Sequence, residues 1–333
     1  MQLHNKLSKP ELIARLNAET FKRKTVSFYR YVNIHNPEEF RDKLYLDWSS
    51  LNCLGRIYVA HEGINAQMSI PEQNVSAFCD LLDNSKELQN MPLKWAIEDD
   101  GHSFYKLVIR VRPKIVADGL SEDVFDTTNV GNHLTPIEFH ELAQNPDVFV
   151  VDMRNSYESE VGHFKNAICP NVSTFREEVE AVVDMLADKK DEKILLYCTG
   201  GVRCEKASAW LKHHGFKDVN QLHGGIIAYF REIHQAGEKS AFIGKNFVFD
   251  NRLGERITPD VLANCHQCGK PCDNHTNCAY QPCHDLIIQC DECKAKYNGC
   301  CSDICHEHQQ KGTSHHRFHE LVGKVNKRKA VNR

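Results

Sequence analysis

The sequence of 333 residues predicts a multidomain α/β protein that ends in a cysteine-rich, metal-binding segment. Three observations predict this fold class. The first third alternates short strands and helices, as in an α+β sandwich, and the middle third alternates buried strands and helices, as in a parallel sheet. Ten of the fifteen cysteines then lie between Cys265 and Cys305. The composition, 41% hydrophobic and 26% charged, is typical of globular proteins.

The distribution of apolar residues bears on the cellular compartment. No stretch approaches the ~18 consecutive apolar residues of a membrane span. The first residues, 1–16, lack the apolar core of a secretory signal. The sequence therefore predicts a cytoplasmic protein without a membrane partner, in which thiols stay reduced. The clustered cysteines are then explained by metal binding rather than by disulfides.

The net charge of -4 conceals an uneven distribution. Residues 1–30 carry a net charge of +5 and residues 311–333, a basic tail, carry +6, so the stretch between them is strongly acidic. Basic ends are compatible with an RNA partner. The alternative is that both ends are simply solvated.

The first domain is expected over residues 1–115. Ser8 and Glu11 have the spacing of a capping box, which predicts a short helix that begins after Ser8. The order of the following elements, β-α-β-β-α-β with one extra strand, is that of a ferredoxin-like sandwich. The expected strands are 25–34, 56–60, 64–70, 93–97 and 104–111, and the expected helices are 37–49 and 72–82.

The last strand of this domain has one basic face. Side chains alternate between the two faces of a strand, so Lys106, Arg110 and Arg112 share one face. We interpret this face as a candidate RNA-binding surface. The alternative is an ordinary solvated face.

A linker is expected at residues 116–134, where periodicity gives way to Pro, Gly, Asp, Asn and Thr. The second domain is expected over residues 135–240, and it begins with a capping box formed by Thr135 and Glu138. Buried strands and helices then alternate, which predicts a parallel sheet covered by helices. The expected strands are 148–151, 194–197 and 219–222, and the expected helices are 175–187, 203–214 and one after residue 225.

A loop with two adjacent glycines follows the expected strand 194–197. Working groups of parallel sheets lie beyond the carboxyl ends of the strands, where Asp152 and Cys198 stand. The glycines let successive N–H groups form an anion-binding nest, the next helix points its positive end at it, and Arg203 adds a charge. These effects favour a nucleophilic Cys198 thiolate, and the alternative is a buried structural thiol. The nest comprises Thr199, Gly200, Gly201, Val202 and Cys204, the last either a resolving thiol or a helix-packed one.

The cysteine-rich region is expected over residues 250–310. Cys265-x2-Cys268 and Cys290-x2-Cys293 have spacing close to that of a four-thiolate zinc site. Further candidate ligands are Cys272, Cys278, Cys300 and Cys305, with Cys283, Cys301, His266, His275 and His284 also available. Spacing does not assign residues to particular ions. The alternatives are an iron–sulfur cluster and a group of reduced thiols.

Several of these motifs together resemble a rhodanese domain. They are Asp152-Met153-Arg154 with Glu158, the loop from Cys198 to Arg203, and His223-Gly224-Gly225. The loop has six residues, as in the sulfur-carrying rhodaneses, whereas related phosphatases use a longer loop. The resemblance implies a persulfide-carrying Cys198 and a bracing role for Asp152, Arg154 and Glu158.

The resemblance extends over about residues 20–305. An acylphosphatase-like first domain with the sequence from Gly55 to Asn65, the loop Cys-Thr-Gly-Gly-Val-Arg-Cys, and the cysteine-rich region together resemble the bacterial oxygen-dependent tRNA uridine hydroxylases. This family converts the wobble uridine, position 34 of the anticodon loop, to 5-hydroxyuridine with molecular oxygen. The resemblance therefore implies a tRNA-modifying oxidoreductase.

Three functions follow from the sequence. The favoured one is this hydroxylation, with Cys198 adding to the base and Arg203 supporting the anionic intermediate. A sulfurtransferase that uses a Cys198 persulfide is the main alternative, and a non-catalytic RNA- or protein-binding module is the third. The sequence has no dinucleotide-binding motif, it identifies no reductant, and its nineteen histidines do not single out a non-haem iron site.

Overall fold

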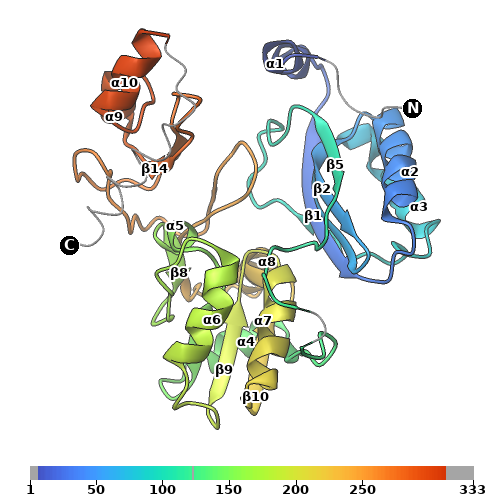
Figure 1. Ribbon diagram of the computed structural model, residues 1–333, viewed down its shortest axis with the longest axis vertical. Helices are drawn as coiled ribbons and strands as arrows, with labels where there is room; N and C mark the ends of the chain where they lie inside the picture. The colour runs from blue at the N-terminus through green and yellow to red at the C-terminus, as the bar shows by residue number, and fades with distance from the viewer. Residues whose placement is uncertain (1–6, 122–123, 313–333) are drawn as a thin grey trace. The chain divides into compact units, whose positions relative to one another are not determined.

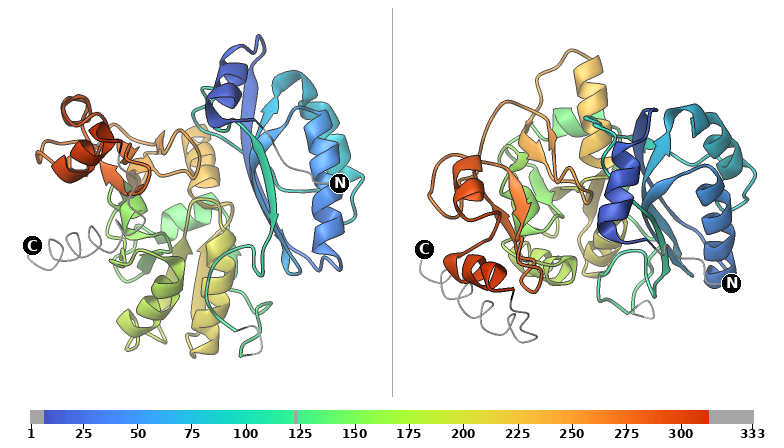
Figure 2. Two further views of the ribbon diagram at one scale, coloured as in Figure 1. Left: turned by 45° about the horizontal axis from the view of Figure 1, so that its top comes forward. Right: turned by 90° about the horizontal axis from the view of Figure 1, so that it is seen from above.

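The computed structural model describes residues 7–121 and 124–312 (Figure 1; Figure 2). The chain divides into two compact units, residues 1–259 and 260–333. The basic tail predicted for residues 311–333 lies, from residue 313 onward, outside the described residues. The first helix is α1 (Lys9–Asn17), and the Glu11 carboxylate accepts a hydrogen bond from the Ser8 backbone N–H at 2.7 Å, as the capping box predicted.

The first domain is a five-stranded sheet in the order β4-β1-β3-β2-β5, with helices on one face (Figure 1). Only the β2–β5 pair is parallel. Phe28 packs against Trp48 and Phe78 between the sheet and the helices, whereas the opposite face carries polar and aromatic side chains. The elements are β1 (Arg23–Tyr31), α2 (Pro37–Ser50), β2 (Leu54–Ala60), β3 (Gly63–Pro71), the 3-10 turn Glu72–Asn74, α3 (Val75–Asp83), β4 (Lys94–Trp95) and β5 (Leu107–Val111).

The second domain is built on a parallel sheet in the order β6-β10-β9-β7. Two hydrophobic cores pack against this sheet. One includes Val179 and Ala207, and the other includes Phe139 and Ile226. The elements are β6 (Asn132–Leu134), α4 (Pro136–Leu142), β7 (Phe149–Asp152), α6 (Phe175–Met185), β9 (Lys193–Tyr197), α7 (Val202–His213), β10 (Asp218–Leu222) and α8 (Gly225–Gln235).

Some elements of this domain differ from those expected. Residues 132–134, predicted as the end of the linker, form β6, because the short segment pairs with β10 although it has no apolar run. A small sheet in the order β12-β11-β8 extends the domain beyond residue 240. Its elements, with the short helix before it, are α5 (Ser156–Ser159), β8 (Gly162–Phe164), β11 (Phe242–Asn246) and β12 (Glu255–Arg256).

The open face of the first sheet lies against the second domain within residues 1–259. The Tyr29 hydroxyl donates to the Glu205 carboxylate at 2.9 Å, and the Tyr31 hydroxyl donates to the Val202 carbonyl at 3.2 Å. The Lys206 ammonium and the Glu62 carboxylate form a largely buried ion pair at 2.6 Å. These contacts hold the sheet over the start of α7.

The second unit is small and rich in cysteine. Its described elements are β13 (His275–Asn277), β14 (Leu286–Ile288), α9 (Asp291–Lys296) and α10 (Asp303–Gln310). Its buried cluster consists of Cys278, Tyr280, Cys283, Cys300 and Cys305, so thiols replace much of the usual aliphatic core. The predicted fold class, an α+β sandwich, a parallel α/β domain and a cysteine-rich segment, is confirmed. Within the described ranges, every helix is too short or too polar to cross a membrane.

Candidate active site

Cys198 follows β9 and begins a tight loop that leads into α7. Gly201 has a φ of 102°, a conformation that favours glycine, and its N–H donates to the Cys198 Sγ at 3.1 Å. A Cβ on Gly201 would lie 2.8 Å from the Tyr29 hydroxyl oxygen, so the first domain also requires a glycine here. The loop therefore forms the nest that the two glycines predicted.

The Cys198 side chain is buried, with 1% of its surface exposed. Burial alone would raise the pKa of this thiol. A hydrogen bond from the Cys204 thiol, the Arg203 charge and the backbone N–H groups of Arg203 and Gly201 outweigh burial and lower the pKa of Cys198 to about 5. Burial and the hydrogen bond to Cys198 raise the pKa of Cys204 well above its usual value. Cys198 is thus held as a thiolate, with a protonated Cys204 as donor.

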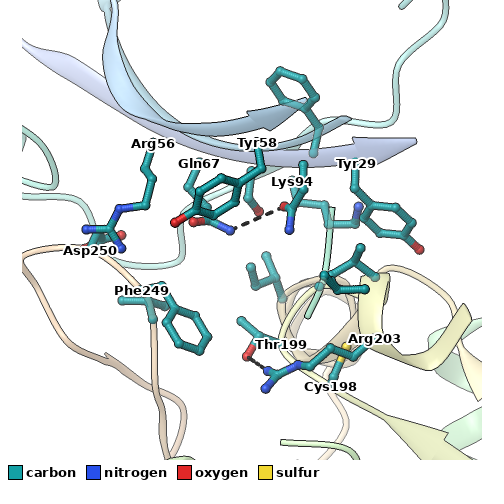
Figure 3. A pocket seen from close by; sticks show the side chains of 18 of the residues that line it. Tyr29, Arg56, Tyr58, Gln67, Lys94, Cys198, Thr199, Arg203, Phe249 and Asp250 are labelled. Carbon is teal, nitrogen blue, oxygen red and sulfur yellow. Dashed lines mark hydrogen bonds between the residues drawn. The ribbon is translucent and has the colours of Figure 1, made fainter. Parts of the chain in front are cut away.

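Arg203 is anchored by an acidic partner below the loop. Its Nη1 and Nη2 donate to the two carboxylate oxygens of Glu158 at 2.6 and 2.9 Å, and Nη2 lies 3.5 Å from the Thr199 hydroxyl (Figure 3). Glu178 is a second buried acid near this pair, and burial raises its pKa to about 9 despite the opposing Arg203 charge. Glu158 therefore accepts two of the five N–H donors of Arg203 in a bidentate ion pair.

Asp152 and Arg154 form a second buried pair. The Arg154 Nε and Nη2 donate to the Asp152 carboxylate at 2.8 and 2.7 Å, and Nη2 also donates to the Gly162 carbonyl at 2.6 Å. The Tyr197 hydroxyl donates to Asp152 at 2.6 Å. Neither charged side chain lines the pocket described below, in keeping with the bracing role expected of them.

A pocket of about 420 Å³ opens above Cys198 (Figure 3). The cysteine loop supplies its floor, the open face of the first sheet supplies the facing wall, and a segment after β11 supplies the third wall. Aromatic rings and amide groups on these walls suit a flat ligand with polar edges. The side chains on these walls include Tyr29, Arg56, Tyr58, Asn65, Gln67, Lys94, Phe249 and Arg252.

The sheet residues of this wall were not predicted as site residues. A signal was present, because Arg56, Tyr58, Asn65 and Gln67 alternate with the buried core residues of β2 and β3. Such alternation indicates that one face of the sheet is not part of the aliphatic core, but it does not show which residues pack against that face. The facing surface is supplied by residues about 130 positions later in the chain.

The predicted basic face lies beside the pocket rather than in it. Arg110 and Arg112 are exposed, and Arg110 is paired in register with Tyr58 of β2, which lines the pocket. The Arg112 guanidinium lies 6.0 Å from the centre of the Tyr58 ring, and the Lys106 ammonium lies 5.6 Å from that of Tyr105. Arg110 and Arg112 therefore lie next to Tyr58 of the pocket wall, at the end of β5, whereas Lys106 precedes that strand.

The cysteines of the second unit form two groups of four. Within each group all sulfur atoms lie within 4.8 Å of one another. Contacts of 3.6 Å between Cys268 and Cys290 and between Cys283 and Cys301 are close to the spacing in a tetrahedral thiolate site. The first group is Cys265, Cys268, Cys290 and Cys293, and the second is Cys278, Cys283, Cys301 and Cys305.

The first group consists of the two predicted Cys-x2-Cys pairs, whereas the second differs from the candidates chosen by spacing. Cys272 and Cys300 belong to neither group, and Cys283 and Cys301 stand in the second. The Cys272 sulfur accepts from the Asn274 N–H at 3.4 Å, and the Cys300 thiol donates to Gln309 at 3.1 Å. Both thiols are thus directed to other partners.

Three family models match successive parts of the chain. They are described as the UPF0176 acylphosphatase like domain, at residues 23–115, the Rhodanese-like domain, at residues 135–232, and the Rhodanase C-terminal domain, at residues 243–306.

Curated relatives match nearly the whole chain. A tRNA uridine(34) hydroxylase of Leptospira interrogans is 55% identical over 303 residues, which are 91% of this chain and 83% of the relative. Relatives of the same name from an Enterobacter species and from Escherichia coli are 52% and 51% identical, covering 92% and 91% of this chain and 88% and 87% of their own lengths. The chain belongs to the tRNA uridine(34) hydroxylase family.

Proposed function

We propose that this protein hydroxylates carbon 5 of the wobble uridine, position 34 of tRNA, with Cys198 at the centre of the reaction. The observation that carries the proposal is a buried thiolate on the floor of a pocket with aromatic and amide walls. A relative that is 55% identical over 91% of this chain is named tRNA uridine(34) hydroxylase. The co-substrate in the proposal is molecular oxygen, and a reductant is required for its second oxygen atom.

The thiolate explains how the base could be activated. Carbon 5 of uracil is a poor nucleophile until a group adds to carbon 6. Addition of the Cys198 sulfur at carbon 6 would turn the ring into an enolate, whose carbon 5 can attack an electrophilic oxygen species. A competing route has Cys198 carry the oxygen, as a sulfenate or on an oxidised persulfide, without a bond to the base.

The pocket requires that the base leave the anticodon stack. Such an extrusion costs little in a single-stranded loop, and flipped bases are commonly held by stacking and by hydrogen bonds to their edges. The Tyr58 and Phe249 rings point into the pocket (Figure 3), and the amides of Asn65 and Gln67 lie on its wall. We propose these four side chains as contacts of the uracil ring, in a cytoplasmic enzyme where free tRNA is available.

The alternative function is sulfur transfer. The match to the Rhodanese-like domain and the six-residue loop from Cys198 to Arg203 favour it, because a Cys198 persulfide could occupy the same nest. Mass spectrometry of tRNA nucleosides from cells with and without the gene distinguishes the two functions. We expect loss of 5-hydroxyuridine and its derivatives in the deleted strain. Loss of thiolated nucleosides with 5-hydroxyuridine intact would instead support sulfur transfer.

We expect the basic face to contact tRNA phosphates. Replacing Arg110 and Arg112 together by Ala should weaken tRNA binding and lower the slope of log affinity against log salt by ~0.7–0.9 for each phosphate that is no longer neutralised. A titration of binding at several salt concentrations measures both. The matched control is Lys43→Ala with Lys86→Ala, which removes two exposed positive charges from the helical side of the same domain. Equal affinity and slope in both double variants would show that the basic face is an ordinary solvated surface that does not contact tRNA.

We propose one structural zinc ion in each group of four cysteines. Four thiolates at this spacing fit a closed tetrahedral site, and such a site supplies folding energy rather than an open position for catalysis. An iron–sulfur cluster is the alternative for either group.

A further inference from the structure

Lys94 lies directly above the cysteine loop. It is on the short edge strand β4 of the first sheet, and its side chain points into the pocket (Figure 3). Its Cδ is 3.8 Å from the position that a Cβ on Gly200 would take, and its Cε is 3.9 Å from that of a Cβ on Gly224. A larger residue at either glycine would thus touch the lysine.

Lys94 differs in its partners from Arg203 and Arg252, two of the three arginines that line the pocket. Arg203 is bound to both oxygens of Glu158, and Arg252 is paired with Asp250 and with Glu255. The Lys94 ammonium lies 4.5 Å from the centre of the Tyr29 ring, and it has no ion pair or hydrogen bond with any residue in the described ranges. Its charge and its N–H groups are therefore available to a ligand.

The groups around Lys94 make it able to exchange a proton near neutral pH. Burial lowers the pKa of Lys94 to about 8, although the Cys198 thiolate and the Glu205 carboxylate oppose the shift. Tyr29 stays protonated, since burial and the nearby Glu205 and Cys198 charges raise its pKa above the usual range. His223 lines a neighbouring cavity together with Lys94. On the α8 side, the Arg231 guanidinium faces Trp95 and donates to its carbonyl.

We propose that Lys94 is the catalytic proton donor that neutralises the base when Cys198 adds to it. This inference rests on the proposed function. The Cys198 sulfur gives an electron pair to carbon 6, the ring double bond shifts toward the carbonyl at carbon 4, and the developing negative charge on that oxygen takes a proton from the Lys94 ammonium. If the addition reverses, the electrons return along the same path and the neutral amine regains its proton. If carbon 5 instead bonds to oxygen, the amine takes the enol proton as the carbonyl at carbon 4 re-forms, and later loss of the proton on carbon 5 expels the thiolate. The addition step needs neither oxidant nor reductant.

The locations of Arg203 and Lys94 support different roles for the two cations, with Arg203 acting on the sulfur and Lys94 acting on the base. Arg203 is on the sulfur side, in the loop, where it stabilises the thiolate and is held by Glu158. Lys94 is on the opposite wall, where the oxygen of a base bonded to Cys198 could reach its N–H groups. A cation that acts on the base rather than on the sulfur is thus supplied by the first domain.

The rate of covalent addition tests the proposal without the oxygen chemistry. The probe is tRNA with deuterium at carbon 5 of uridine 34 alone, and the readout is the exchange of that deuterium with water, which requires addition at carbon 6. Mass spectrometry follows the exchange over pH without oxygen. For the wild-type protein we expect the rate to fall as pH rises through about 8, where Lys94 loses its proton. Lys94→Met should slow addition at least about tenfold and remove this alkaline fall. Lys94→Arg should keep addition and move the fall to higher pH, because arginine stays protonated.

Lys43→Met is the control for loss of a lysine, since Lys43 is exposed on α2. Addition by Lys94→Met at the wild-type rate, or a slower addition that keeps the fall near pH 8, would overturn the proposal. A wild-type protein that hydroxylates tRNA but exchanges no deuterium would also overturn it, while the proposed hydroxylase function would stand. Absence of hydroxylation together with deuterium exchange that depends on Lys94 would support Lys94 and contradict the proposed function.

Discussion

Cys198→Ala is expected to abolish 5-hydroxyuridine formation, because both routes considered above use the Cys198 sulfur. Loss of a nucleophile typically reduces turnover by more than about 10³-fold. The nest, Arg203 and the pocket walls should remain, so tRNA binding should change little. Nucleoside analysis after incubation with tRNA measures the first effect and a binding titration the second. Full modification by Cys198→Ala would rule out both routes.

Two other cysteines provide controls for this experiment. Cys79→Ser changes a half-buried thiol on α3, outside the pocket, and should leave activity unchanged. Cys204→Ala removes the thiol that donates to Cys198, so it should raise the pKa of Cys198 and slow the reaction without abolishing it. If removal of Cys204 were as damaging as removal of Cys198, Cys204 would be a resolving thiol rather than a donor.

The reactivity of Cys198 should also have an unusual pH dependence. Its pKa is lowered to about 5, whereas an ordinary thiol has a value of 9.0. Covalent labelling by a small alkylating reagent should therefore stay constant as pH falls from about 9 and decline only near pH 5, since the thiolate is the reactive form. Mass spectrometry of the labelled peptide gives the rate at each pH. A decline that begins near pH 9 would show that the nest does not stabilise the thiolate.

Removal of the metal is expected to unfold the C-terminal unit. Its described part has few aliphatic core residues, and its buried cluster is largely thiols, so the proposed metal ions would supply most of its folding energy. Binding of a structural zinc ion contributes on the order of 10 kcal/mol in small zinc domains. Elemental analysis should find two metal ions per chain. Cys290→Ser and Cys301→Ser should each reduce that number and make residues 260–312 sensitive to protease.

Cys272→Ser is the matched control, because Cys272 is a buried cysteine of the same unit that belongs to neither group. It should retain both metal ions. Protein purified without chelator that contained neither zinc nor iron would contradict the assignment of both groups. Release of an ion in Cys272→Ser would show that ligands are exchanged between cysteines.

The fold was predictable where the signal was local. Capping residues placed the starts of α1 and α4, and continuous apolar runs placed β9 and β7. β6 and β8 were not predicted because each has three residues and depends on a partner strand that is distant in sequence. Local sequence does not contain such pairing information.

The candidate site, too, was predictable only where its residues are contiguous in the sequence. The loop at Cys198 is one contiguous segment whose glycines, helix start and arginine all act on one atom, so the sequence alone pointed to it. The facing wall with Tyr58 and Lys94 comes from another domain, and only the folded chain brings it over the loop. Likewise, spacing identified the two Cys-x2-Cys pairs but did not select Cys301 over its neighbour Cys300, because the local turn decides which thiol faces the group.

The most direct test of the proposed hydroxylation is the source of the atom added to position 34. Purified protein, tRNA and a reductant are incubated under oxygen-18 gas, and the nucleosides are analysed by high-resolution mass spectrometry. Exact mass is needed because adding one unlabelled oxygen and replacing one oxygen by sulfur give the same nominal mass. Hydroxylation centred on Cys198 predicts 5-hydroxyuridine with the heavy isotope for the wild-type protein and none for Cys198→Ala. A sulfur-containing nucleoside, or a hydroxyl group without the isotope, would contradict it.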